Sequence, residues 1–98
     1  MKKQELIDLI SYSEESYYSL FDADLEIPSD VVKVASEIKQ EKYRWFTTAV
    51  NVYKCEDGYV GVCGVQMVLS DYMSAEDCGY PCEAREYKES TTITYIPA

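Results

Sequence analysis

The stretch FTTAVNVYKCEDGYVGVCGV, which runs from Phe46 to Val65, decides the fold. Its two halves each alternate with a period of two residues, as β-strands do, and Asp57-Gly58 lies between them. An Asp-Gly pair between two alternating runs rich in β-branched residues is the strongest short-range indication of a β-hairpin. We therefore expect two antiparallel strands joined by a tight turn.

The turn also predicts which residues of the hairpin face each other. A two-residue turn at Asp57-Gly58 pairs Val52 with Cys63. It also pairs Val50 with Val65, and these four side chains form one apolar face that a helix is expected to cover. The other, wetter face is expected to carry Asn51, Tyr53, Val62 and Gly64.

Upstream of Tyr43 the apolar residues have helical spacing. The first group predicts a helix over residues 2–12 and consists of Leu6, Ile7, Leu9 and Ile10. Ser13 is a candidate cap for a second helical turn. The buried side of that turn would hold Tyr17, Leu20 and Phe21.

A further helix is predicted after Pro28, which disfavours helix at Ile27. Ser29 or Asp30 is its expected cap, and it ends near Gln40–Glu41. Its apolar face recurs at positions i, i+3, i+4 and i+7, namely Val31, Val34, Ala35 and Ile38.

The C-terminal part is predicted to hold a long loop and one more strand. Residues 70–82 form the loop, with one helical turn capped by Ser74, and a bent strand runs from about Glu83 to Ile96. The whole chain, residues 1–98, is thus expected to be a single α+β domain, helical over 1–41 and β-rich over 43–97. Its N-terminal helices would pack on one face of a three-stranded antiparallel sheet.

Composition excludes several classes of function. Eighteen acidic and nine basic residues give a net charge of −9, which repels nucleic acid and anionic lipid and attracts cationic surfaces. The chain has no histidine, so the commonest catalytic base is missing. There is no continuous apolar signal segment or membrane span. We expect a cytoplasmic, non-enzymatic protein without a cofactor, and no contact with membrane or nucleic acid.

The four cysteines do not have the spacing of a zinc site. Cys78 and Cys82 are spaced as in a zinc knuckle, but Cys55 and Cys63 are separated by a hairpin. With a two-residue turn Cys55 and Cys63 point to opposite faces, and with a three-residue turn they lie about 13 Å apart at ~3.3 Å per residue. A small loop closed by a disulfide between Cys78 and Cys82 is geometrically conceivable, but a reducing compartment disfavours it. We expect no metal site and four reduced thiols, and keep a zinc or thiol protein as the weakest alternative.

The acidic residues gather in one part of the chain. Between Glu14 and Val32 there are six carboxylates and no basic side chain, and tyrosines lie among them. Such a cluster is suited to pairing with lysines and arginines, while tyrosine supplies contact area. The predicted partner-binding residues are Glu14, Glu15, Tyr17, Tyr18, Asp22, Asp24, Glu26 and Asp30.

Residues 44–62, from Arg44-Trp45-Phe46 to Val60-Gly61-Val62, resemble small acidic proteins encoded by bacteriophages and prophages. That group has no assigned activity, so the resemblance implies no functional residues. Phage context implies a host-directed inhibitor, for example of a CRISPR or restriction nuclease. The leading hypothesis is a protein that occupies a basic, nucleic-acid-binding surface of a host protein. The alternative is an assembly protein that forms a homodimer through the edge of its sheet.

Overall fold

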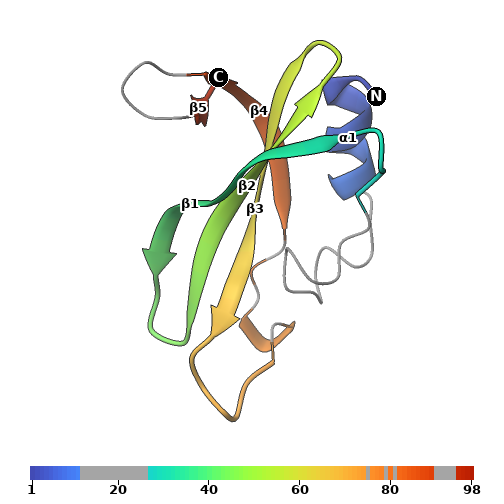
Figure 1. Cartoon of the computed structure of the whole chain (residues 1–98). Helices are drawn as coiled ribbons and strands as arrows, with labels where there is room; N and C mark the ends of the chain where they lie inside the picture. The colour runs from blue at the N-terminus through green and yellow to red at the C-terminus, as the bar shows by residue number, and fades with distance from the viewer. Residues whose placement is uncertain (12–26, 75, 79, 81, 90–94) are drawn as a thin grey trace.

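The computed structural model describes residues 1–11, 27–74, 76–78, 80, 82–89 and 95–98. It contains one antiparallel sheet with the strand order β1-β2-β3-β4-β5 (Figure 1). In chain order the elements are α1 (Lys3–Ser11), β1 (Val32–Lys42), β2 (Phe46–Cys55), β3 (Gly58–Val68), the short 3-10 helix η2 (Glu76–Cys78), β4 (Glu83–Glu89) and β5 (Tyr95–Pro97). Each strand therefore lies beside the strand before it.

The predicted α+β class is wrong, because the described chain is mostly β. Residues 1–41 were expected to be helical, yet the described part of this range is helical only over Lys3–Ser11, and Val32–Lys42 is a strand. The sheet has five strands where three were expected. The single strand expected over Glu83–Ile96 is replaced by β4 and β5, with residues 90–94 outside the described ranges.

The bulges of strand β1 explain why a helix was predicted for its residues. Its eleven residues pair with residues 47–54 of β2, because the register shifts by one residue at each of three bulges. The partners of Val52, Val50 and Thr48 are Ala35, Ile38 and Glu41. Repeated bulges thus return every third residue to the same face of the strand. In the sequence this spacing is hard to distinguish from the 3.6-residue period of a helix.

The β2–β3 hairpin is confirmed, with a register two residues away from the predicted one. Its turn residues are Glu56 and Asp57, Cys55 lies opposite Gly58, and Val50 pairs with Cys63. An even shift leaves every side chain on the face expected for it. Gly58 has a φ of 147°, which favours glycine, and a Cβ there would lie 3.0 Å from the Lys3 side chain.

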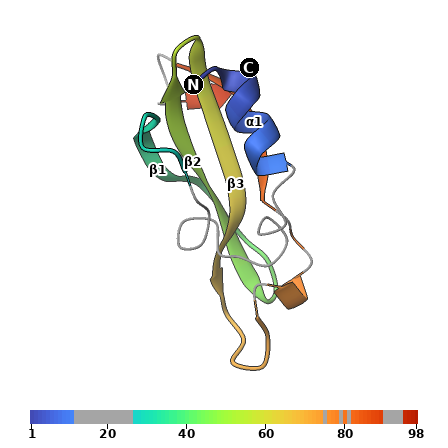
Figure 2. The same ribbon diagram turned by 90° about the vertical axis from the view of Figure 1, so that its right-hand side faces the viewer.

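Both faces of the sheet carry a buried cluster. The helix-side cluster contains Leu6, Ile10, Val31, Ala49, Tyr53, Cys55, Val60, Val62 and Cys82. The tyrosine-side cluster contains Val50, Val52, Tyr87 and Tyr95. The face covered by α1 is therefore the one predicted to be wetter, and the prediction that a helix covers Val50 and Val52 is wrong. Figure 2 shows α1 standing against β3 on its own side of the sheet.

Two local predictions are confirmed. The N-terminal helix is present as α1, whose residues Leu6 and Ile10, one turn apart, are both buried. The helical turn after Ser74 is present as η2, where the Ser74 hydroxyl accepts a hydrogen bond of 3.4 Å from the Asp77 N–H. The second helical turn predicted after Ser13 lies outside the described residues. None of the described helices is long and apolar enough to cross a membrane.

Candidate functional site

Most of the predicted acidic site lies outside the described residues. This holds for Glu14, Glu15, Tyr17, Tyr18, Asp22, Asp24 and Glu26. Asp30 lies in the turn before β1, and its side chain is 61% exposed. Two described residues flank the acidic segment of residues 12–26. Ser11 is the last residue of α1, and Ile27 packs against the helix-side cluster. Both flanks of the acidic segment are therefore on the helix face of the sheet.

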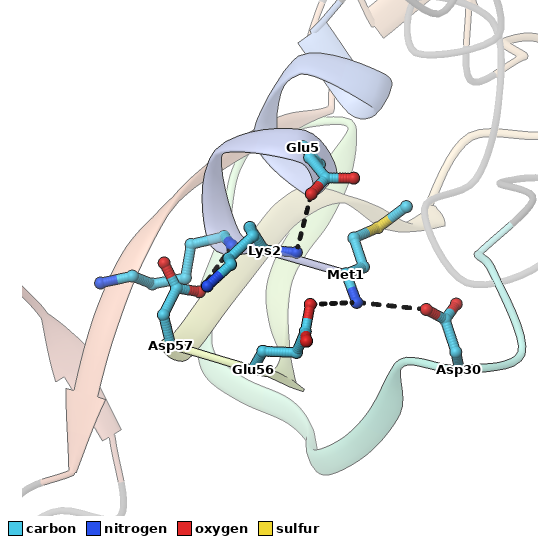
Figure 3. Close-up of polar contacts among 7 residues, drawn as sticks. Met1, Lys2, Glu5, Asp30, Glu56 and Asp57 are labelled. Atoms are coloured by element: carbon cyan, nitrogen blue, oxygen red, sulfur yellow. Dashed lines mark hydrogen bonds and ion pairs between the residues drawn. The ribbon is translucent and has the colours of Figure 1, made fainter.

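Asp30 is partly neutralised by the N-terminus of the chain (Figure 3). The α-ammonium group of Met1 lies 3.0 Å from Glu56 and 3.2 Å from Asp30. These hydrogen bonds, first to Glu56 and then to Asp30, raise the pKa of the α-ammonium group above its usual value. One cation thus connects the β2–β3 turn with the start of β1.

Backbone groups hold the same turn against α1. The Lys3 N–H donates a hydrogen bond of 2.8 Å to Asp57 Oδ1, which lowers the pKa of that carboxyl group. The Glu56 N–H donates to the carbonyl of Met1 at 3.1 Å. The Lys3 ammonium lies 2.6 Å from Glu86 on β4. The start of α1 is therefore fixed to both the hairpin and β4.

Negative charge is distributed unevenly along the chain. Residues 12–26 contain five of the eighteen acidic residues and none of the nine basic ones. Ion pairs within 4 Å, among the carboxylates in the described ranges, involve Asp30, Glu56 and Glu86. The outer side of α1 adds Glu5 and Asp8, which are both exposed. The helix face of the sheet thus carries the exposed carboxylates of α1 and the two described flanks of residues 12–26.

The opposite face of the sheet contains a groove with a cavity volume of about 290 Å³. All five strands contribute to its lining, together with Tyr80 from the segment before β4. The apolar part of the lining includes Val50 of β2 and Cys63 of β3, which are direct cross-strand partners. We call this feature the tyrosine-side groove, because Tyr87 and Tyr80 both line it.

Tyr87 forms much of the groove wall and is held on two sides. Its ring covers Gly61, since a Cβ at that position would lie 2.5 Å from two of its ring carbons. The Lys39 ammonium lies over the same ring, 5.4 Å from its centroid, as in a cation–π contact. Lys39 reaches it from a bulged part of β1 where its φ is 51°. The bulge therefore directs a cation over the groove.

The groove carries two cations and two anions. These are Lys39, Arg85, Glu41 and Glu83. None of these four groups lies within 4 Å of an oppositely charged group among the residues that the structure describes. Their formal charges cancel. The groove therefore suits a ligand that carries both signs better than one that carries a single charge.

The thiol in the groove is poorly suited to nucleophilic chemistry. Burial raises the pKa of Cys63, and its hydrogen bond of 3.7 Å with the Tyr80 hydroxyl does not reverse this. The same hydrogen bond and burial raise the pKa of Tyr80. Both groups stay protonated at neutral pH and act as neutral polar contacts.

The other cysteines also lack the features of a reactive or metal site. Burial raises the pKa of Cys82 to about 11 and also raises those of Cys55 and Cys78. Cys55 belongs to the helix-side cluster and Cys63 packs against the tyrosine-side cluster, which confirms that they point to opposite faces. Within the described ranges, no three Cys, Asp or Glu side chains are grouped to hold a metal ion.

Sequence reasoning did not find the tyrosine-side groove. Its charged residues come from β1 and β4, and β1 had been interpreted as a helix. A helix that ends near Gln40–Glu41 would have placed Lys39 in its last turn. The one available signal was the alternation of Glu83, Arg85 and Tyr87, which places all three on one face of a strand.

No protein-family model matches the chain, and neither does any curated protein or any solved structure in the comparisons made. The fold and the site are therefore interpreted from their own geometry. The resemblance of residues 44–62 to phage-encoded proteins stays a prediction.

Proposed function

We propose that the protein is a non-enzymatic binding protein that occupies a basic, nucleic-acid-binding surface of a host protein. The observation that carries this proposal is the concentration of negative charge in residues 12–26, which hold five acidic residues and no basic one. A partner surface rich in Lys and Arg would attract this segment over a distance of about 8 Å at physiological salt. An inhibitor of a CRISPR or restriction nuclease would act in this way.

The described fold supports such a role through its anchoring of the segment. Ser11 ends a helix that is packed on the sheet, and Ile27 packs against the helix-side cluster. Asp30 follows directly and is 61% exposed even though it contacts the Met1 ammonium. The two ends of the acidic segment are therefore fixed on the helix face, which also carries the exposed carboxylates Glu5 and Asp8 of α1.

The experiment is an affinity capture from bacterial lysate treated with nuclease, eluted with a salt gradient and then with duplex DNA. The test variant reverses Glu14, Glu15, Asp22 and Asp24 to Lys. The control variant reverses the same number of exposed carboxylates away from α1, namely Glu37, Glu41, Asp71 and Glu89. Both variants have the same net charge, so only the position of the charge differs between them.

We expect the wild-type chain and the control variant to capture the same protein from the lysate. Duplex DNA should displace that protein from both. The test variant should lose it at salt concentrations where the control still binds, because exposed charge pairs are screened by salt. Equal loss in both variants would leave only a general effect of charge. Unchanged capture by the test variant, with its circular dichroism intact, would contradict the proposal.

Self-association is the second proposal, and one observation favours it. Trp45, Met67 and Leu69 are each more than 40% exposed at the end of the β2–β3 hairpin. The Leu69 N–H donates to the Trp45 carbonyl at 2.8 Å, and Met67 pairs with Thr47. The three apolar side chains are therefore neighbours on one side of the ladder, as in a contact surface.

Sedimentation equilibrium tests this proposal. It should show a dimer that Met67→Lys converts to a monomer, and a wild-type protein that is monomeric at all concentrations would exclude self-association.

A further inference from the structure

The charges in the tyrosine-side groove are separated along the strands. Arg85 and Glu83 lie two residues apart on β4 and pair with Gly61 and Cys63, so both face the groove. Two residues of a strand span about 6.8 Å. The ammonium of Lys39 lies at the Arg85 end, because it sits over the ring that covers Gly61.

The second carboxylate lies at the other end. Glu41 pairs with Thr48, and Thr48 pairs with Val65, two residues along the strands from the row of Cys63 and Glu83. The groove therefore has a cationic end formed by Lys39 and Arg85 and an anionic end formed by Glu83 and Glu41. The neutral Cys63 side chain lines the groove in the row of Glu83, at the anionic end.

The size of the groove limits the ligand. A volume of about 290 Å³ lies at the lower end of the range for small-molecule sites, which begins at about 300 Å³. This is enough for a small molecule and too little for a folded element. A chain of two amino acids spans about 7 Å when extended. That length is close to the backbone spacing of Arg85 and Glu83 along β4, about 6.8 Å.

The backbone of β1 is strained where it supplies the cation. Lys39 has a φ of 51° and Glu37 a φ of 54°, a region that side chains with a Cβ adopt at a cost in energy. Such strain gathers at ligand sites, and bulges redirect side chains beside them. The Glu37 N–H is held by Asn51 Oδ1 at 2.9 Å, and Asn51 is fully buried. The fold therefore maintains a strained segment that places Lys39 over the groove.

From these observations we infer that the tyrosine-side groove binds a short zwitterionic peptide, of dipeptide length, with an apolar or aromatic side chain. Its carboxylate would lie between Lys39 and Arg85, and its ammonium group would lie beside Glu83. Its side chain would contact the Tyr87 ring. Peptide binding in the groove does not depend on the acidic segment of residues 12–26. The groove is on the face of the sheet opposite α1.

The test measures binding of three forms of one probe by isothermal titration calorimetry. The probes are the dipeptide Gly-Phe, its N-acetyl form and its C-terminal amide. Gly-Phe should bind in the range of millimolar or tighter, and each blocked form should bind at least about tenfold more weakly, because each loses a charge-assisted contact. Equal affinity for all three forms would overturn the inference, as would no binding of Gly-Phe at about 10 mM.

Variants assign the binding to the groove. Arg85→Gln and Glu83→Gln should each weaken Gly-Phe binding by about tenfold. Lys88→Gln is the matched control, because Lys88 is exposed on the same strand and faces the other side. Circular dichroism shows whether each variant is folded. A folded Arg85→Gln protein that binds Gly-Phe as tightly as the Lys88→Gln control would also overturn the inference.

Discussion

Replacing Gly61 with Ala tests the packing of Tyr87 directly. The added Cβ would lie 2.5 Å from the Cδ1 and Cε1 atoms of the ring and 2.8 Å from Cζ. Carbon atoms in contact prefer about 3.5–4.0 Å, so the ring must move by about 1 Å. Tyr87 is only 6% exposed and has little space for that movement. We expect Gly61→Ala to destabilise the protein, although alanine suits a strand better than glycine.

The magnitude follows from two opposing effects. Overpacking of a core costs about 1–3 kcal/mol. The lower backbone entropy of alanine in the unfolded chain offsets about 0.5–1 kcal/mol of this. Taking the middle of each range, the free energy of unfolding should fall by about 1 kcal/mol. For a domain of this length that corresponds to a decrease in Tm of roughly 4 to 8 °C.

Urea unfolding followed by circular dichroism measures the effect, and a double-mutant cycle assigns it to the ring. In a Tyr87→Val background the added methyl group meets no ring, and Gly61→Ala should cost less than about 0.5 kcal/mol. In a Tyr87→Phe background the ring remains, and the cost should equal that in the wild type. An equal cost in the Val and Phe backgrounds would refute the reasoning.

Three further predictions concern β1 and the buried thiol. Asn51→Ala should lower the free energy of unfolding by about 1–3 kcal/mol, because the Glu37 N–H loses its acceptor, and hydrogen exchange at that amide should speed up. Glu37→Gly should instead stabilise the protein by roughly 0.5–1 kcal/mol, measured by urea unfolding, because glycine adopts a φ of 54° freely. Burial raises the pKa of Cys82 to about 11 from its ordinary 9.0, so the unfolded chain ionises first and stability falls between pH 9 and 11. Cys82→Ala should flatten that decline by up to about 2 kcal/mol in pH-dependent urea titrations, and an unchanged slope would contradict the assignment.

The hairpin could be predicted from the sequence because its indications are local. Asp57-Gly58 and the alternation on either side of it predict both strands and the face of each side chain. The register could not be predicted, because contacts from the N-terminus act on the turn. The carbonyl of Met1 accepts from the Glu56 N–H, and Asp57 accepts from the Lys3 N–H. These partners are more than fifty residues away in the chain.

The strand at residues 32–42 could not be distinguished from a helix by periodicity. Its three bulges place Ala35, Ile38 and Glu41 on one face at intervals of three. Bulges depend on the neighbouring strand and on acceptors such as Asn51, which is a tertiary effect. Because residues 32–42 were predicted to be a helix, the tyrosine-side groove could not be predicted, since Lys39 lines it from this strand.

The face of the sheet that α1 covers could not be predicted from the sequence either. Strand β2 is buried on both sides over residues 48–53, so its two faces are similarly apolar. Such continuous burial is typical of central strands that are covered on both faces. The concentration of acidic residues in residues 12–26 is visible in the sequence, and these residues lie outside the described ranges.

The bulges of β1 have a consequence for the behaviour of the protein at high concentration. Amyloid-type growth requires an outer strand whose amide and carbonyl groups are evenly spaced, so that an incoming chain can extend the ladder. With three surplus residues in eleven, β1 offers its free groups at irregular intervals. The opposite border ends in β5, which is three residues long and contains Pro97. Resistance to fibril formation is thus built into the backbone at both borders and should persist even when salt screens the net charge.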